Sequence, residues 1–430
     1  MVLELAQRKR HGVGRFVALF VLAIGSIAGM AVGSRAQAET QYTPLITLAQ
    51  RYNSNVWNTS QERIPPGKQK WDLVTRLGAG VTILNKSRLG DTEVRAGVDG
   101  NAYAYNTDLS YISTDVRASS DMSNWANELL PGLGLRISDA FRYTPNQAAF
   151  PQAVTSQGVT PQSSDIFSRG IQPARANTWS NSLSTDGDYA FSRSVGLRAD
   201  YTFSMLRIGR VFATEVTPAG TLSYFDTTAH NVAIGPTYTL DGGDTLFLKY
   251  NYLTSDQSST SSSTSIQFTS QSIQPEYVTK IARDWTARIS GGATMVEQAG
   301  NRTFFSGSFS LTNEFDRQTQ VSIAVSRQAA PGFFGTGGAF ITNVAQLYVS
   351  YGFSRVAQLT VRGNYAHGES APVKVATFES ITGAAVLDYK LTRDTKLSLS
   401  QEYGHFTLTG TTPFSFDQII TMLMVSMEWK

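Results

Sequence analysis

Apolar and polar residues alternate along many stretches of this chain. Residues 358–365 read QLTVRGNY, so that Leu359, Val361 and Tyr365 alternate with Gln358, Thr360, Arg362 and Asn364. Successive side chains of a β-strand point to opposite faces, so one face of this segment is apolar and the other is polar and charged. The pattern predicts strands whose apolar face is covered either by a protein core or by lipid.

One unit recurs through the chain: an alternating strand that ends in an aromatic residue, a short polar turn, and a second alternating strand. Examples are 188–205, 238–253, 277–295, 314–327 and 388–406. The links between these hairpins are longer and less regular, as at 255–264, 329–340, 407–415 and, longest of all, 146–177. Short turns on one side and long loops on the other are typical of an outer-membrane β-barrel.

Counting the alternating segments predicts about eighteen strands, each about ten residues long, which is the length of a tilted strand that crosses hydrocarbon. They start near residues 45, 71, 93, 109, 132, 183, 195, 228, 244, 266, 285, 302, 319, 343, 357, 378, 396 and 417. An even number of strands places both ends of the chain on the periplasmic side.

The two faces differ in what they can contact. Aromatic residues next to the short turns suit a membrane interface, among them Tyr238, Tyr277, Phe315, Tyr351, Tyr389 and Trp429. The opposite faces carry many charges, and a Lys or Arg facing lipid at mid-membrane costs about 2–4 kcal/mol. We therefore expect an all-β, transmembrane, antiparallel up-and-down barrel with lipid outside and a hydrated lumen. The alternative is a secreted soluble β-sandwich or propeller, but such proteins use shorter strands and do not alternate turn lengths.

The N-terminus has the features of a sorting signal. Arg8, Lys9 and Arg10 precede an apolar run at 16–33, and Ala36-Gln37-Ala38 supplies a small-x-small cleavage site. We predict a signal peptide at 1–38 and a single outer-membrane barrel domain at 39–430, located in a bacterial outer membrane. The alternative is an uncleaved inner-membrane anchor, because the apolar run is just long enough to span a bilayer.

Charge and composition exclude several classes of function. The whole chain carries a formal charge of +3, but after residue 38 it has 31 Lys and Arg against 32 Asp and Glu. This balance gives no electrostatic case for nucleic-acid binding. The chain has no Cys and only four scattered His, so we expect no disulfide, no Cys- or His-rich metal site and no cofactor.

The start of the mature chain carries a family resemblance. Residues 44–58, PLITLAQRYNSNVWN, contain a Tyr-polar-Ser-Asn-Val-aromatic signature after the first strand. This signature and the hairpins that follow resemble the β-barrel porin 2 family of bacterial outer-membrane proteins. The sequence departs from that pattern at Asn53, where Asp is expected. The resemblance implies a barrel linked with exopolysaccharide or capsule export, and it supplies no catalytic residues.

These observations predict a passive conduit for an exported polysaccharide, with outer-membrane lipid and periplasmic export components as partners. Selectivity would come from the residues that line the pore. The predicted pore-lining residues are Arg76, Arg95, Asp99, Tyr103, Arg117, Arg136, Arg198, Asp200, Lys249, Arg288, Tyr348, Arg362, Lys390 and Glu402. The basic ones would attract an acidic polymer and the aromatic ones would stack on sugar rings; the alternative for each is an interior salt bridge or ordinary lining.

Two other functions fit the same sequence. A general porin for small polar solutes uses the same lining residues, and the 146–177 loop would then fold inward as a constriction or stay on the surface. A barrel enzyme would need a nucleophile beside a base. His367, His405, Ser415 and Asp417 lie near strand ends but within no family motif, so we expect polar rim residues and no enzyme.

Overall fold

The computed structural model describes residues 39–144, 175–211, 224–260, 262–314, 318–332, 337–410 and 413–429. The predicted signal peptide at 1–38 lies outside these residues, as do Phe315 and residues 145–174, which hold most of the predicted long loop. None of the described helices is long and apolar enough to cross a membrane.

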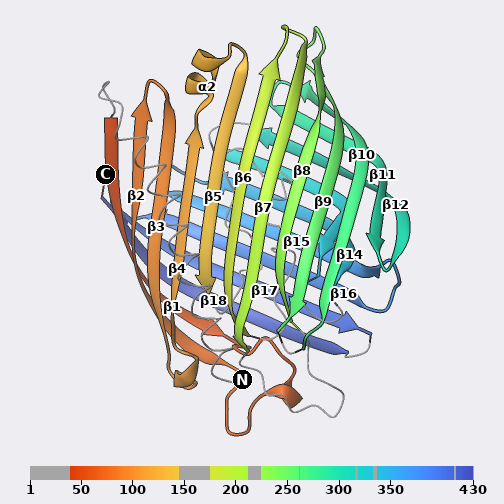
Figure 1. Cartoon of the computed structure of the whole chain (residues 1–430). Coiled ribbons are helices and arrows are strands. Elements are labelled where there is room, and N and C mark those ends of the chain that lie inside the picture. The colour runs from red at the N-terminus through yellow and green to blue at the C-terminus, as the bar shows by residue number, and fades with distance from the viewer. Residues whose placement is uncertain are drawn as a thin grey trace, which may run out of the picture.

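The described chain forms one antiparallel sheet of eighteen strands that closes on itself, since β1 pairs with both β2 and β18 (Figure 1). Each strand pairs with its neighbours in sequence, which is the predicted up-and-down topology. The first nine strands are β1 (Glu39–Asn53), β2 (Asp72–Ser87), β3 (Gly90–Tyr103), β4 (Tyr111–Asp121), β5 (Leu133–Thr144), β6 (Ala176–Ala190), β7 (Val195–Val211), β8 (Phe225–Thr239) and β9 (Thr245–Ser259). The others are β10 (Ser265–Ala282), β11 (Trp285–Gln298), β12 (Gly300–Glu314), β13 (Thr319–Pro331), β14 (Ala339–Gly352), β15 (Ala357–Ala371), β16 (Thr377–Lys390), β17 (Thr395–Thr409) and β18 (Phe414–Glu428).

The strands are longer than predicted, at 11 to 18 residues instead of about ten. The difference is largest where the apolar pattern stops but the ladder of hydrogen bonds continues, as in β6, which begins at Ala176 and not near 183. A period-two pattern detects only the part of a strand whose two faces differ in polarity, so polar extensions are missed.

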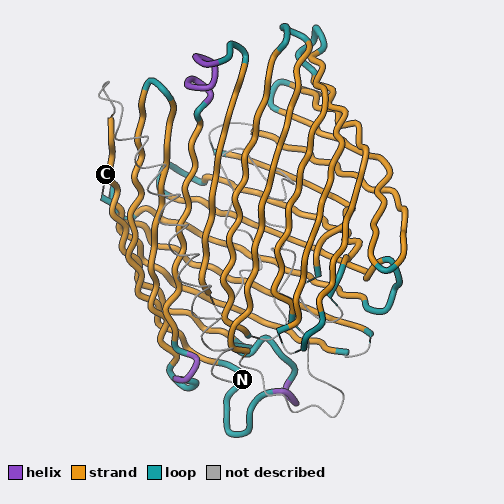
Figure 2. Tube along the Cα trace, in the orientation of Figure 1, coloured by secondary structure: helices purple, strands orange, loops and turns teal. Residues whose placement is uncertain are grey.

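The connections differ between the two ends of the barrel, as expected. The short-turn end holds residues 88–89, 191–194, 240–244, 283–284, 353–356 and 391–394, together with the start of β1 and the end of β18. Longer segments lie at the long-loop end, including 54–71 with the 3-10 helix η1 (Gln61–Arg63) and 104–110 with the 3-10 helix η2 (Thr107–Leu109). Figure 2 shows these helices at one end and α2 (Ser123–Leu129) at the other.

Two connections break this rule. The segment 122–132 at the short-turn end contains α2, and β11 and β12 at the long-loop end are joined by Ala299 alone. Turn length is therefore not uniform at either end, although the overall asymmetry that predicted a barrel is present.

The outer surface carries an apolar band bordered by aromatic residues. On β1, Tyr42 and Tyr52 are exposed and point the same way, ten residues apart, with Ile46 and Leu48 between them. At a rise of about 3.4 Å per residue and a tilt of about 40°, they are separated by about 26 Å along the barrel axis, close to the height of a membrane-facing band. Other exposed aromatics mark the same two borders: Tyr238, Phe353, Tyr389 and Trp429 near the short turns, and Tyr365 and Tyr403 nearer the long loops.

One border aromatic also fixes a turn. The Tyr277 hydroxyl donates a hydrogen bond to the Asp244 carboxylate in the β8–β9 turn. This hydrogen bond holds the pKa of the Asp244 carboxyl below its ordinary value.

Candidate functional site in the barrel interior

All fourteen predicted pore-lining residues lie on the inward face of the strands. Arg362, for example, lies between Val361 and Gly363, whose partners in β14 are Val349 and Leu347 of the exposed apolar face. The same register rule places the others inward: Arg76, Arg95, Asp99, Tyr103, Arg117, Arg136, Arg198, Asp200, Lys249, Arg288, Tyr348, Lys390 and Glu402. That any of them contacts a passing solute stays a prediction.

Most of the inward basic residues form ion pairs within the wall. The Arg76 guanidinium lies 2.8 Å from Asp99, and Arg198 lies 3.0 Å from Asp200. Further pairs join Arg95 to Glu93, Arg117 and Arg142 to Asp115, Arg136 to Asp121, and Lys396 to Asp388. These pairs are the alternative that the sequence left open for each residue. Because many of them are partly exposed, each contributes only about 0–1 kcal/mol to stability.

One inward group has more positive than negative charge. The nearly buried Glu276 carboxylate on β10 lies 3.7 Å from Lys249 on β9 and 3.3 Å from Arg288 on β11. Two cations therefore share one carboxylate on three neighbouring strands, which leaves a net positive charge on this part of the wall.

The aromatic residues predicted to stack on sugars have a different role. Tyr103 and Tyr348 are buried, with 3% and 8% of their surface exposed. The Tyr103 ring packs beside Val56 and Trp57, and the Arg175 guanidinium lies 4.6 Å from its centre. Both rings are part of packed protein, so they do not face an open lumen.

A large apolar cluster lies on the inward faces near the long-loop end, which the sequence did not predict. Phe340, Phe378, Phe406 and Phe416 form a row across β14, β16, β17 and β18, with successive ring centres 5.7, 6.3 and 5.8 Å apart. This aromatic row belongs to a cluster that also includes Leu206, Leu253, Phe268 and Val296 on inward faces, all less than 9% exposed. These side chains are packed against one another and are not exposed to an open aqueous channel.

The ends of the β13–β14 connection are fastened to the inner wall. The Gln257 side-chain amide of β9 donates to the Gly332 carbonyl at 2.7 Å, and its oxygen accepts from the Gly338 backbone N–H. The Gln298 amide oxygen of β11 accepts from the Ala339 backbone N–H at 3.0 Å. Gly338 has φ of 79°, and an added Cβ would lie 2.5 Å from the Gln298 amide, so only glycine fits here. Whether the 146–177 loop folds inward or stays on the surface is not tested, because residues 145–174 lie outside the described part of the chain.

Asn53, Asn55, Trp57 and Asn58 belong to the stretch that carries the family resemblance, and they lie beside Gln418 at the seam between β1 and β18. We call these five residues the seam clasp. The Gln418 amide donates to Asn53 Oδ1, the Asn55 carbonyl and Asn58 Oδ1 at 3.2, 2.8 and 2.7 Å. The Asn55 amide donates to the Asp417 carbonyl at 3.0 Å. Asn53 Oδ1 accepts from the Gln418 amide and from the Asn55 backbone N–H, as an Asp carboxylate oxygen at this position would.

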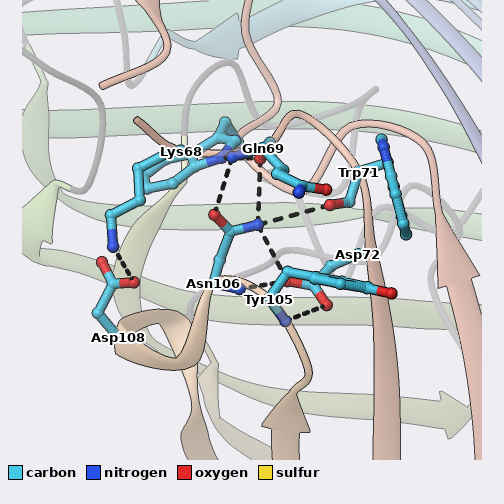
Figure 3. Close-up of polar contacts among 8 residues, drawn as sticks. Lys68, Gln69, Trp71, Asp72, Tyr105, Asn106 and Asp108 are labelled. Atoms are coloured by element: carbon cyan, nitrogen blue, oxygen red, sulfur yellow. Dashed lines mark hydrogen bonds and ion pairs between the residues drawn. The ribbon is translucent and has the colours of Figure 1, made fainter. Parts of the chain in front are cut away.

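A second group of contacts joins the first two loops of the long-loop end (Figure 3). The buried Asp72 carboxylate accepts from the backbone N–H groups of Ala104, Tyr105 and Asn106 at 2.7–3.0 Å. The Asn106 side chain also donates to the Gln69 carbonyl, and Lys68 pairs with Asp108 (Figure 3). A buried carboxylate with this many donors is fully satisfied, so Asp72 orders the rim and is not a reactive group.

Two of the residues considered for catalysis, His405 and Asp417, meet on the outer face near the long-loop end. His405 on β17 is the cross-strand partner of Asp417 on β18, with Nδ1 2.8 Å from Oδ1, and Thr407 Oγ1 lies 3.0 Å from His405 Nε2. His367 is two strands away on β15. A hydroxyl, an imidazole and a carboxylate in line resemble a catalytic relay. Their backbone groups lie in the β17–β18 ladder.

No group of three or more potential metal-ligating side chains occurs within the part of the chain that the structure describes.

Comparisons with known proteins add the following. No protein-family model matches the sequence, and no curated protein matches it. Among solved structures, the chain is similar to Acinetobacter baumannii OccAB3, with a TM-score of 0.41 and 11% identity over 90% of this chain and 100% of that chain. It is similar to Pseudomonas aeruginosa OpdK, solved with vanillate (TM-score 0.43, 10% identity, 90% and 99% covered). A BenF-like porin from Pseudomonas fluorescens Pf-5 gives a TM-score of 0.42 at 10% identity, with 90% and 99% covered.

Proposed function

We propose that this chain is an outer-membrane pore through which small polar solutes diffuse. One observation carries the proposal: a closed eighteen-stranded barrel has exposed apolar side chains outside and charged side chains inside. Apolar side chains in such a band are stable only when lipid covers them. Charged groups inside need water or ion partners, and barrels of 16–18 strands are wide enough to hold an aqueous channel.

Small solutes fit the interior better than a polymer does. With eighteen strands about 4.8 Å apart and tilted by about 40°, the circumference predicts a barrel roughly 36 Å wide between opposite Cα atoms. Side chains of the wall alone cannot fill that width, yet the inward residues of the aromatic row are almost fully buried. The path at the long-loop end is therefore narrowed by protein. A wide exit for an exopolysaccharide or capsule polymer, with periplasmic export partners, has less support.

Selectivity would arise where ion pairing is incomplete. Lys249 and Arg288 share Glu276, so this part of the wall attracts anions. Replacing both with Ala leaves Glu276 as the only charge of the group. We expect planar-bilayer recordings of this double variant to shift from anion toward cation preference. Unchanged selectivity would exclude this group from the conducting path.

Vesicle permeability separates the two kinds of cargo. The purified mature protein, reconstituted into vesicles, should admit monosaccharides and small organic anions and exclude dextrans. Vesicles with protein denatured before reconstitution are the control for leakage. Equal permeation of dextran and monosaccharide would favour the polymer conduit, and permeation of neither would contradict a pore.

A further inference from the structure

Four of the short turns share a sequence pattern that has no part in the proposed pore. Three of them have a large apolar residue, a hydroxyl residue and an arginine in succession: Phe191-Ser192-Arg193, Phe353-Ser354-Arg355 and Leu391-Thr392-Arg393. A fourth, Ile281-Ala282-Arg283, has Ala in place of the hydroxyl residue. We call these four segments the arginine turns. They connect β6–β7, β14–β15, β16–β17 and β10–β11, so they are spread around one end of the barrel.

The hydroxyl residue fixes the shape of the turn. Ser192 Oγ accepts from the backbone N–H groups of Ser194 and Val195 at 3.3 and 3.0 Å. Ser354 and Thr392 accept from the corresponding N–H groups two and three residues later, at 3.0–3.3 Å. A hydroxyl that caps two backbone donors is a local device that defines a turn. The same conformation therefore places the arginine at the tip each time.

The four arginine turns expose the same two kinds of side chain, an apolar residue and an arginine. The apolar residue of each arginine turn, two residues before the arginine, is 52–63% exposed although it is a Phe, Ile or Leu. Each arginine is exposed. Among the described residues, none of the four arginines has an ion pair, whereas Arg88 at the same end is bonded to Glu128 at 2.7 Å.

An exposed apolar side chain next to an exposed guanidinium matches the chemistry of a membrane border. The apolar residue continues the band into hydrocarbon, and the arginine reaches the layer of phosphates just beyond it. A guanidinium can bind phosphate oxygens with two parallel hydrogen bonds. Basic residues at an anionic membrane surface add about a fivefold preference each.

We propose that the arginine turns form a ring that binds the headgroups of anionic phospholipids in the leaflet at the short-turn end. The inference rests on the proposed membrane location of the barrel. Arg193 and Arg355 contribute most, because Asp284 and Asp394 directly follow Arg283 and Arg393 and offset part of their charge.

The β8–β9 turn is a natural control. It reads Leu240-Asp241-Gly242, with an exposed apolar residue in the same place but with glycine where the arginine stands. A Cβ added to Gly242 meets no atom within 4 Å, and its φ lies outside the left-handed region. Gly242→Arg therefore adds an arginine tip without a steric clash.

Native mass spectrometry of the detergent-solubilised, folded protein tests the proposal. The protein is titrated with phosphatidylglycerol or phosphatidylcholine of equal chain length, and stepwise binding constants are compared. We expect phosphatidylglycerol to bind about fivefold more tightly than phosphatidylcholine in its first steps. Arg193→Gln combined with Arg355→Gln should bring the ratio of the two binding constants to about one, whereas replacing both arginines with Lys should keep most of the preference for phosphatidylglycerol. Gly242→Arg should add one further binding step that prefers phosphatidylglycerol.

The controls separate this inference from the proposed function. Lys68→Gln removes one positive charge at the long-loop end and should leave the ratio unchanged. A ratio that is equal in the wild type and the double Gln variant would overturn the proposal. Folding and conductance in planar bilayers are measured on the same variants, so a failure of the membrane assignment would appear there, in the wild type too.

Discussion

A single lysine placed on one or the other face of β1 probes which face meets lipid. Leu48 is 54% exposed and lies midway between Tyr42 and Tyr52, the two border aromatics of that strand. Thr47, the adjacent residue, points inward and lies beside Gly78 and the Asp99 carboxylate. Leu48→Lys puts an ammonium group into hydrocarbon at mid-height, whereas Thr47→Lys puts it next to a carboxylate in the lumen.

The expected difference is large. A lysine at the membrane midplane costs about 2–4 kcal/mol, a factor of about 30 to 900 in the unfolding equilibrium. The inward lysine should change the free energy of unfolding by less than about 1 kcal/mol, because it stays hydrated and shares the partly exposed Asp99 carboxylate with Arg76. Both variants carry the same added charge at neighbouring positions, so effects on net charge or on the unfolded chain cancel.

The assay is reversible unfolding by guanidinium chloride in fluid phosphatidylcholine vesicles, followed by Trp fluorescence. The chain offers six Trp as reporters. Both variants are compared with the wild type in the same lipid. If Leu48→Lys destabilised the protein no more than Thr47→Lys, the assignment of the apolar face to lipid would be refuted.

Three further predictions address the clasp, the cluster and one turn. Gln418→Ala removes the amide that donates to Asn53, Asn55 and Asn58, and it should lower the free energy of unfolding by about 1–3 kcal/mol. The folded band on a gel should then disappear at a lower temperature than in the wild type. An unchanged temperature would contradict a stabilising role of the seam clasp. Phe406→Ala should lower the free energy of unfolding by about 3–5 kcal/mol. It should also raise single-channel conductance, because it removes a ring from the inward cluster. A conductance equal to that of the wild type would show that the cluster does not border the conducting path. Tyr277→Phe should raise the pKa of Asp244 toward its ordinary value. The stabilisation by this hydrogen bond is present above the unfolded carboxyl pKa of about 3.9 and is lost as pH falls through the lower folded value. The free energies of unfolding of the wild type and the variant should therefore differ at neutral pH and become equal at low pH.

The fold could be predicted because two solvents act on opposite faces of every strand. Lipid outside and water inside force a period of two, so residues such as Val361 and Arg362 can be assigned to faces without knowing their neighbours. All eighteen predicted strands occur, and fourteen candidate residues take the inward face as the pattern requires. The predictions erred at strand ends, where both faces are polar and the period carries no signal.

The inward apolar cluster could not be predicted in the same way. Phe378 and Phe406 have the parity of the polar face, and each stands near a strand end, where a rim residue and a core residue look alike in sequence. Their burial depends on contacts with side chains of other strands. Glutamines 257 and 298 likewise look like ordinary polar lining until the chain places Gly338 and Ala339 beside them.

The His405–Asp417 contact could have been found from sequence. Hairpin pairing fixes the register of β17 and β18, and in that register these two residues are direct partners. His367 and His405 lie on strands that are not neighbours, since β16 lies between them. What it could not supply is the side-chain order that links Thr407, His405 and Asp417.

Nitroxide scanning of β1 tests the central claim most directly. The chain has no Cys, so single cysteines can be introduced one at a time from Tyr42 to Asn53 and spin-labelled in the reconstituted protein. Collision with oxygen should be high at the even positions. Collision with a water-soluble nickel chelate should be higher at the half-buried inward positions Leu45 and Thr47 than at Ile46 and Leu48 beside them. Equal accessibility to both reagents along the strand, or a chelate that reaches the even positions at mid-height, would contradict a barrel with lipid outside and water within.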